Sequence, residues 1–484
     1  MAYGDRYEMV CGIETHAEMA TKTKIFCACS TEFGAEQNTH VCPVCLGLPG
    51  TLPVLNREAV NLAIKAGLAL NCEIATVSKF DRKNYYYPDL PKNYQTSQFD
   101  LPIAKNGWLE ITTDAGGGKR VGITRAHMEE DAGKLVHSGE TITTSSAGSS
   151  VDYNRAGVPL LEIVSEPDLR SPEEALAYLT SLVRILDYAG VSDCKLEQGS
   201  VRFDVNLSLR PKGRADLGTR TEMKNLNSLS AVRRCLEYEA ERQAGVLDGG
   251  GQIIQETRTW DEGREMTLSL RSKEEAHDYR YFPEPDLMPL RISPAWVESM
   301  RRALPELPEA RRERLIGLGL SPYDAGVIIA DKDLALYFDE ALKTGPDVKT
   351  LANWLTSELY GLLNARGESL AACLIKPAAL AALVNLIKQG AISGKMGKTV
   401  LEMMASTGRD PEDIVRAEKM TQISDAAELS ALVDEVLANN PKSADDYRGG
   451  KEQALGFLVG QVMRLTKGQA NPALVNRILK EKLN

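Results

Sequence analysis

The chain has 484 residues, of which 43% are hydrophobic and 26% charged, so it is long enough for several domains of roughly 100–200 residues with ordinary apolar cores. No run of about 18 apolar residues occurs and no apolar segment follows the first residues, so we expect no membrane span, no secretory signal and a cytoplasmic location. The net charge of −10 argues against a nucleic-acid binder, although residues 442–484 carry eight Lys or Arg against four Asp or Glu.

Residues 1–292 are predicted to form a strand-rich domain of the α+β class. Three segments alternate between polar and apolar residues and are bounded by Gly, Pro and Asn turns, as β-strands are: 7–19, 158–166 and 200–210. Helices are expected over about 56–70, 171–190 and 228–245. The second has the clearest signals, with Ser171 as N-cap, Pro172 in the first turn, Glu174 in a capping box and Gly190 at the end.

After about residue 290 the composition changes to Ala- and Leu-rich patterns of helical period, interrupted by Pro and Gly. We therefore predict two all-helical domains, over 295–405 and 408–484. The Asp410–Pro411 pair marks the expected joint between them.

Four of the nine cysteines lie within FCACSTEFGAEQNTHVCPVC, residues 26–45. They are spaced as C-x-C, twelve residues and C-x-x-C: Cys27, Cys29, Cys42 and Cys45. Two short turns with four thiolates suit a closed tetrahedral Zn²⁺ site, which leaves no position for water or substrate. We predict a structural zinc knuckle over 27–45. Four buried free thiols are the alternative, and a catalytic zinc using His40 is less favoured.

Acidic side chains recur on the predicted strands. In GIETH, Glu14 and His16 are two residues apart and therefore project from the same face of a strand. The full set of candidates is Glu14, His16, Glu129, Glu130, Asp204 and Glu222. Each alone is compatible with a solvated strand face. If they converge, their oxygens and one imidazole suit Mg²⁺, as phosphoryl transfer requires.

Two segments of catalytic appearance are rejected. GAISGKMGKT has Ile392 where a phosphate-binding loop needs its first Gly. TTSSAGSSVDY, residues 143–153, lacks the Gly pairs and the Lys of an amidase nucleophile region and is interpreted as a mobile polar loop. The five remaining cysteines have no recognisable nucleophile context. Any ammonia for amide chemistry must therefore come from elsewhere.

Eight long motifs follow one another along the chain: TKTKIFCACSTEFG, CPVCLGLPGTLPVLN, FDRKNYYYPDLPKNYQTSQ, HMEEDAGKLVHSG, DYNRAGVPLLEIVSEPDLRSPEEA, EMKNLNSLSAVRRCLEYE, DYRYFPEPDLMPL and VGQVMRLTKGQANPALVNRIL. In this order they closely resemble the B subunits of the tRNA-dependent amidotransferases, over nearly the whole chain.

The resemblance implies a cradle-shaped α+β catalytic domain, a helical domain and a helical tail domain that binds tRNA. It implies a ligase that uses ATP and Mg²⁺ to phosphorylate the side-chain carboxylate of Glu on mischarged tRNA-Gln, or of Asp on mischarged tRNA-Asn. Ammonia would then displace the phosphate. A glutamine-hydrolysing, amidase-type A subunit would supply the ammonia, and a small C subunit would complete a heterotrimer.

The motifs also carry residue roles. They imply that Glu14, His16 and Glu129 bind Mg²⁺, that Glu130, Asp204 and Glu222 are further catalytic positions, and that the four cysteines bind zinc. Lys83, in RKNYYYPDLPKNYQ, is a candidate for binding a cofactor or the tRNA acceptor end. In the basic tail, tRNA phosphates are expected at Arg464, Lys467 and Arg477, with a solvated helix face as the alternative.

A second hypothesis remains open at this point. The protein could be a non-catalytic, zinc-containing scaffold that binds tRNA, in which the acidic strands form only a polar surface. A stand-alone zinc hydrolase is disfavoured by the four-sulfur ligand set.

Overall fold

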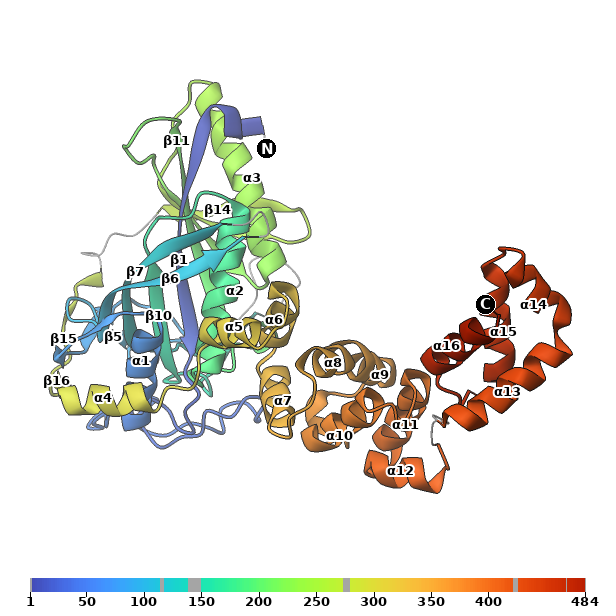
Figure 1. Ribbon diagram of the computed structural model, residues 1–484. Coiled ribbons are helices and arrows are strands. Elements are labelled where there is room, and N and C mark those ends of the chain that lie inside the picture. The colour runs from blue at the N-terminus through green and yellow to red at the C-terminus, as the bar shows by residue number, and fades with distance from the viewer. Residues whose placement is uncertain are drawn as a thin grey trace. The chain divides into compact units, whose positions relative to one another are not determined.

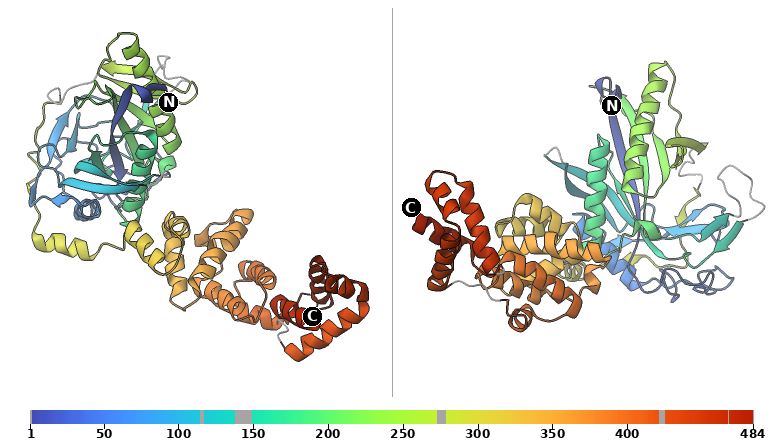
Figure 2. Two further views of the ribbon diagram at one scale, coloured as in Figure 1. Left: turned by 45° about the horizontal axis from the view of Figure 1, so that its top comes forward. Right: turned by 90° about the vertical axis from the view of Figure 1, so that its right-hand side faces the viewer.

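The computed structural model describes residues 2–113, 117–137, 149–272, 279–420, 425–466 and 468–483. The chain divides into two compact units, residues 1–308 and 309–484. The first is rich in strands and the second is helical throughout its described part (Figure 1, Figure 2), which confirms the predicted α+β class. No helix among the described residues is long and apolar enough to span a membrane.

The first unit is built on a nine-stranded sheet with the order β14-β13-β12-β11-β1-β10-β7-β6-β2. Its strands are β1 (Tyr7–Glu18), β2 (Glu73–Ile74), β6 (Ala104–Thr112), β7 (Gly118–Glu130), β10 (Pro159–Ser165), β11 (Val201–Pro211), β12 (Thr221–Leu226), β13 (Glu256–Asp261) and β14 (Met266–Ser272). Neighbours are antiparallel, except that β12 and β13 run parallel. The three strands predicted from alternation are β1, β10 and β11, and they lie side by side.

Smaller ribbons complete the first unit. A three-stranded sheet contains β4 (Asp81–Asn84), β5 (Tyr94–Ser97) and β15 (Phe282–Pro283), and β5 packs near β7 of the main sheet. Two-stranded pairs join β3 (Val77–Ser78) to β16 (Leu290–Arg291) and β8 (Lys134–His137) to β9 (Ser149–Asp152). Most of the polar loop predicted over 143–153 lies outside the described residues.

One face of the main sheet is covered by helices. α2 (Pro172–Tyr188) and α3 (Leu229–Asp248) contact each other and reach β6 and β11 respectively (Figure 2), while α1 (Arg57–Ala69) packs on β6 and β7. The odd-numbered side chains of β1 point into this core: Met9, Cys11, Ile13, Thr15 and Ala17 are all at most 1% exposed. The alternation of a strand therefore directs Glu14 and His16 to the opposite face.

The three predicted helices are confirmed, with small changes at their ends. Asn56, Ser171 and Ser228 each accept a hydrogen bond from a backbone N–H in the first turn, as N-caps do. The carboxylate of Glu174 accepts from the backbone N–H of Arg170, one residue before the expected partner. The third helix continues to Asp248, beyond the Gly245 at which the prediction ended.

The last helix of the first unit is α4 (Pro294–Arg302), where Trp296 Nε1 donates to Asn61 Oδ1 of α1 at 2.8 Å. The second unit contains α5 (Pro308–Gly317), α6 (Pro322–Ile329), α7 (Lys332–Leu342), α8 (Val348–Asn353), the π-helical turn Trp354–Leu359, α9 (Tyr360–Arg366), α10 (Pro377–Lys388), α11 (Gly394–Thr407) and α12 (Pro411–Ala417).

The last described helices have a core of their own. They are α13 (Ala426–Asn439), α14 (Pro441–Arg448), α15 (Gln453–Leu465) and α16 (Pro472–Leu483), and they bury Leu429, Val433, Leu458, Val462 and Val475 together. α12 instead packs against α10 and α11, although it follows the Asp410–Pro411 pair. The predicted boundaries at 292–295 and 405–408 stay a prediction.

Candidate functional site

A cavity of about 570 Å³ opens on the face of the main sheet opposite α2 and α3. Five carboxylates line it, and they come from five different strands: Glu14, Glu129, Glu162, Asp204 and Glu222. The structure therefore brings together five of the six predicted acidic-site residues, His16 included, and adds Glu162. Their catalytic roles stay a prediction.

Strand register explains this convergence. β1 lies between β10 and β11, and Glu14 is paired with Asp204 while His16 is paired with Glu162. On the far side of β10, Glu162 is paired with His127 of β7. Paired side chains on one face of antiparallel strands lie about 5 Å apart, so each pair meets above the sheet.

His16 is at the centre of the cavity. Its Nδ1 lies 3.2 Å from Glu129 Oε1 and 3.9 Å from Glu162 Oε2, and its Nε2 lies 3.8 Å from Asp204 Oδ2. Burial lowers the pKa of His16, but the hydrogen bond with Glu129 and the nearby carboxylates outweigh burial and raise this pKa to about 9. An imidazole surrounded by carboxylates in this way holds a cation in place, either a proton or a metal ion.

The pKa values of the carboxylates are shifted by the same closely packed charges. The pKa of Glu14 is raised, first by burial and then by the charges of Glu162, Glu222 and Asp204. Burial would also raise the pKa of Glu129, but its hydrogen bonds with His127 and His16 hold this pKa well below its ordinary value. Closely packed like charges of this kind are stabilised by a divalent cation.

The donor atoms fit a hard metal ion. Two sets of side chains each bring their ligand atoms within 4.8 Å of one another, and both sets include His16. One set adds Glu14 and Asp204, and the other adds Glu129 and Glu162. Oxygen-rich sets with open positions suit Mg²⁺, which keeps water and phosphate oxygens in its shell.

Cations border these acids. Lys224 Nζ donates to Asp204 Oδ2 at 2.7 Å, and Arg125 Nη2 lies 3.6 Å from Glu162 Oε1. Lys83 Nζ lies 4.8 Å from the ring centroid of Tyr279 and 5.7 Å from that of Tyr85. Burial lowers the pKa of Lys83, but the net effect of the surrounding tyrosine oxygens and of Glu129 is to raise it.

Glu130 is not brought to the other acids. Its Oε1 accepts from the backbone N–H of Thr96 at 2.8 Å and pairs with Lys92, beside a separate cavity of about 140 Å³ next to the cysteines. Glu130 was grouped with Glu129 from the sequence, but adjacent residues of a strand point to different sides, so the two carboxylates do not meet at one site.

Sequence reasoning missed several residues that line the large cavity: Arg125, His127, Glu162, Lys224, Tyr279 and Tyr281. A signal existed for Glu162, because it is the only charged residue within the apolar strand PLLEIVS. No spacing rule identifies the others, since they reach the cavity through the order of strands in the sheet.

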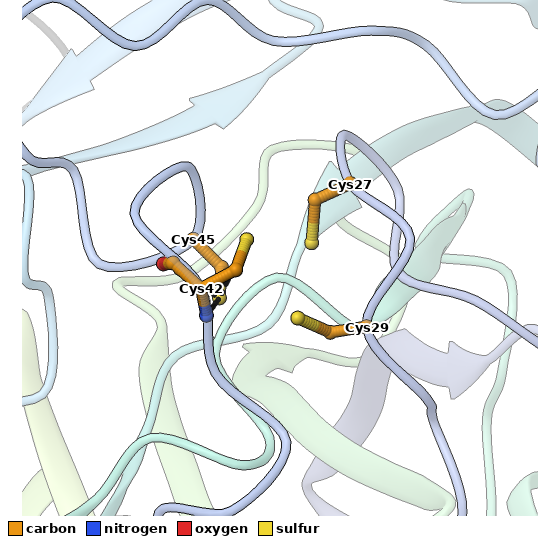
Figure 3. Close-up of side chains that lie close together, drawn as sticks. All are labelled: Cys27, Cys29, Cys42 and Cys45. Atoms are coloured by element: carbon orange, nitrogen blue, oxygen red, sulfur yellow. Dashed lines mark hydrogen bonds between the residues drawn. The ribbon is translucent and has the colours of Figure 1, made fainter.

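The four cysteines also converge (Figure 3). Their Sγ atoms all lie within 4.8 Å of one another, and Cys42 and Cys45 are 3.9 Å apart. Zn–S bonds of about 2.3 Å in a tetrahedron place sulfur atoms about 3.8 Å apart, so the cluster fits Zn²⁺. A hydrogen bond from Cys27 lowers the pKa of Cys45 to about 4, against burial, which suits thiolate ligation.

The basic tail residues are exposed. Arg464 lies near the end of α15, and Arg477 on α16 is 3.7 Å from Glu481. Lys467, the third residue predicted to contact tRNA, lies outside the described residues.

Similarity to known proteins shows the class to which this chain belongs. Residues 9–298 match the family model described as the GatB/GatE catalytic domain, and residues 336–483 match that described as the GatB domain. Similar proteins, each named as the B subunit of an aspartyl/glutamyl-tRNA(Asn/Gln) amidotransferase, occur in Carboxydothermus hydrogenoformans (59% identical, 99% of both chains), Moorella thermoacetica (58%, 99% of this chain and 100% of the relative) and Brevibacillus brevis (53%, 99% of both).

The chain belongs to the family of aspartyl/glutamyl-tRNA(Asn/Gln) amidotransferase B subunits. This confirms the resemblance deduced from the motifs and makes the protein part of an amidotransferase, which is a ligase. The family model for the catalytic domain spans the whole acidic cavity and the cysteine cluster.

Proposed function

We propose that this chain uses ATP to phosphorylate the side-chain carboxylate of Glu on mischarged tRNA-Gln, of Asp on mischarged tRNA-Asn, or of both, and then joins ammonia to the activated carbon. The observation that carries this proposal is the pair of ligand sets that share His16 within one cavity. The names of the relatives support the aminoacyl-tRNA substrates.

The chemistry needs such a site. A carboxylate reacts poorly with ammonia because its leaving group would be oxide. Attack of a carboxylate oxygen on the γ-phosphorus of ATP, with release of ADP, gives an acyl phosphate. Ammonia then attacks the acyl carbon and inorganic phosphate leaves. Mg²⁺, held by His16 with Glu14 and Asp204 or with Glu129 and Glu162, would offset the repulsion between the reacting anions.

The protein's own groups position these reactants. Lys224 and Arg125 place positive charge at the rim of the carboxylate cluster, where phosphate oxygens would otherwise be repelled. Asn206 Nδ2 donates to Glu14 Oε1 at 2.9 Å and Thr257 Oγ1 donates to Glu222 Oε2 at 2.8 Å. These bonds fix the two carboxylates before any ligand arrives.

The ammonia is proposed to come from a partner. Burial raises the pKa of the Cys11 and Cys72 thiols to about 12, so neither is suited to act as the nucleophile of a glutaminase. This supports delivery of ammonia by an amidase-type A subunit, within a cytoplasmic heterotrimer completed by a small C subunit. The cysteine cluster is proposed to bind a structural Zn²⁺, and the basic tail to contact tRNA.

Substitution of His16 or Glu14 by Ala tests the proposal. In the complex assembled with its partner subunits, ATP cleavage that depends on Glu-tRNA or Asp-tRNA should be abolished in both variants. Glu110→Ala, which removes an exposed carboxylate of β6, is the matched control and should behave as the wild type. Unchanged cleavage in the His16 and Glu14 variants would instead support a non-catalytic tRNA-binding scaffold.

Assay of the wild-type complex against both misacylated tRNAs defines the substrate range. Product from only one of them would restrict the proposal to that tRNA.

A further inference from the structure

A second histidine lies among the carboxylates of the acidic cavity, and the proposed function gives it no role. His127 lines the cavity from β7, two residues before Glu129. Its side chain is only 5% exposed, whereas the side chain of His16 is 19% exposed. The two imidazoles therefore differ in access, because His16 is open to a ligand in the cavity and His127 is enclosed.

Strand register places the two histidines on either side of one carboxylate. Glu162 of β10 is paired with His127 of β7 on one side and with His16 of β1 on the other. Side chains at paired positions of antiparallel strands project from the same face of the sheet. Glu129 follows His127 on this face of β7, because side chains two residues apart in a strand share a face.

The Nε2 atom of His127 lies between the two carboxylates. It is 3.4 Å from Glu162 Oε2 and 3.8 Å from Glu129 Oε2. His16 approaches the other oxygen of Glu129, with its Nδ1 at 3.2 Å from Oε1. A proton on His127 Nε2 therefore faces one oxygen of each carboxylate, while His16 adjoins both residues from β1.

The second ring nitrogen of His127 indicates where the proton lies. Nδ1 is buried and has no hydrogen-bond partner among the described residues. A proton on Nδ1 would be a buried donor without an acceptor, and such orphaned N–H groups are rare in folded proteins. A ring with its proton on Nε2 fits this environment, and it can donate to a carboxylate but offers no lone pair there to a metal ion.

We propose that His127 is a positioning residue of the metal site, which donates from Nε2 to Glu162 and Glu129 and leaves metal ligation to His16; this rests on the proposed function. The hydrogen bond holds the two carboxylates in the arrangement that brings one oxygen of each within 4.8 Å of the His16 ligand atom. Ligating carboxylates are commonly oriented in this way by groups that do not touch the ion.

Two variants that differ by one methylene group test the proposal in the complex assembled with its partner subunits. The amide nitrogen of His127→Gln can take the place of Nε2 and donate to the carboxylates, whereas the amide of His127→Asn is too short to reach them. Mn²⁺ affinity, measured by electron paramagnetic resonance, should fall roughly 10–100-fold in His127→Asn and stay within about threefold of wild type in His127→Gln.

Stability and metal dependence separate positioning from packing. Both variants replace the ring by a carboxamide, so their thermal unfolding should agree although their Mn²⁺ affinities differ. ATP cleavage dependent on misacylated tRNA should recover in His127→Asn when the Mg²⁺ concentration is raised, because the variant weakens metal binding. Equal Mn²⁺ affinity in the two variants, whether both are weakened or both match the wild type, would overturn the proposal.

Pulsed electron paramagnetic resonance of Mn²⁺ bound to the wild-type complex requires no variant to fold. It should detect one coordinated imidazole nitrogen, from His16. Two coordinated imidazoles would make His127 a ligand and overturn the proposal. Failure of the proposed function is distinguishable, because the wild-type complex would then show no ATP cleavage dependent on misacylated tRNA, whereas the Mn²⁺ measurements need neither ATP nor tRNA.

Discussion

His16 Nδ1 lies 3.2 Å from Glu129 Oε1, although the two residues belong to β1 and β7, which β10 separates in the sheet. Both side chains therefore lean over β10, from which Glu162 rises between them, 3.9 Å from the same imidazole nitrogen. The surroundings of His16 Nδ1 are thus formed by three strands that are neighbours in the sheet and distant in the chain. No short segment of sequence contains them.

This position predicts that Glu162 is as important for metal binding and ATP cleavage as the acidic residues that the sequence motifs identified. In the assembled complex, Glu162→Gln should lower the rate of ATP cleavage dependent on misacylated tRNA about 100-fold and weaken Mn²⁺ binding, measured by electron paramagnetic resonance. Glu166→Gln, four residues further on at an exposed position, is the control. Wild-type metal affinity in the Glu162 variant would remove this residue from the site.

The cysteine cluster is predicted to stabilise structure and not to take part in phosphoryl transfer. Cys42→Ser should eliminate bound zinc and increase hydrogen exchange around residues 23–56, while the metal site at His16 stays intact. Cys373→Ser, a half-buried cysteine of the second unit, is the control and should retain zinc. A Cys42 variant that stays folded and keeps its affinity for tRNA, yet loses the kinase step, would contradict the structural role.

Lys24 is predicted to support the zinc ligands. Its side chain is 0% exposed, and its Nζ lies 3.6 Å from Cys45 Sγ and donates to the carbonyl oxygen of Tyr153 at 3.2 Å. Four thiolates around Zn²⁺ carry a net charge of −2, which a buried ammonium offsets. Lys24→Met should therefore lower zinc affinity roughly 10–100-fold in competition with a chromogenic chelator.

Lys22→Met provides the matched control for this experiment, because Lys22 is exposed two residues away. Equal zinc affinity in the two variants would show that Lys24 acts only in packing or through Tyr153.

Local sequence signals predicted the helices and strands. The order of the strands in the sheet determines which side chains meet at the acidic site. Ser171 was recognised as an N-cap from the sequence, and the structure adds Asn56 and Ser228 as the caps of the other two predicted helices, because an N-cap is a local interaction. The two-residue period of a strand likewise placed Glu14 and His16 on one face. The same rule separates Glu130 from Glu129, its neighbour along β7, and the Glu130 carboxylate pairs with Lys92 instead.

Longer-range features left no such signal. Lys224 reaches Asp204 because β12 pairs with β11, and Thr257 reaches Glu222 because β13 runs parallel to β12 after the intervening α3. Which strands become neighbours depends on burial of the whole sheet, a non-local effect. The resemblance of the motifs identified most of the site residues. Strand pairing in the structure added Glu162 and the two cations beside the carboxylates, Lys224 and Arg125.

A buried ionic network around Glu239 of α3 predicts that the stability of the first unit depends on pH. Glu239 of α3 is 0% exposed and accepts hydrogen bonds from Arg242, Thr221 and Thr267. Burial by itself raises the pKa of Glu239, but these bonds and the charge of Arg242 hold it below the ordinary value of 4.5. Its contribution to stability is therefore present above pH 4.5 and is lost as the pH falls through the lowered pKa.

Glu239→Gln should accordingly lower the free energy of unfolding at neutral pH by about 2 kcal/mol, measured by urea denaturation followed through the fluorescence of the first unit. The difference from wild type should shrink under acidic conditions. Glu237→Gln, at a partly exposed residue of the same helix paired with Arg233, is the control. A deficit that is equal at both pH values would mean that Glu239 contributes by shape and not by charge.

The tail helices are predicted to contact the tRNA backbone. Arg477 on α16 is 66% exposed, and its nearest acid, Glu481, lies 3.7 Å away, so the guanidinium can exchange this weak pair for a phosphate. Each phosphate contact releases about one counterion. Arg477→Ala should therefore reduce the slope of log affinity for tRNA against log salt concentration by about 1, with a similar loss for Arg464→Ala.

Arg416→Ala provides the matched control, because Arg416 on α12 is exposed and pairs with Asp413 at 3.9 Å in the same way. Affinity should be measured by filter binding over a series of salt concentrations. A uniform loss of affinity with an unchanged slope would mean that the tail acts through its fold, because a removed phosphate contact necessarily changes the number of released ions.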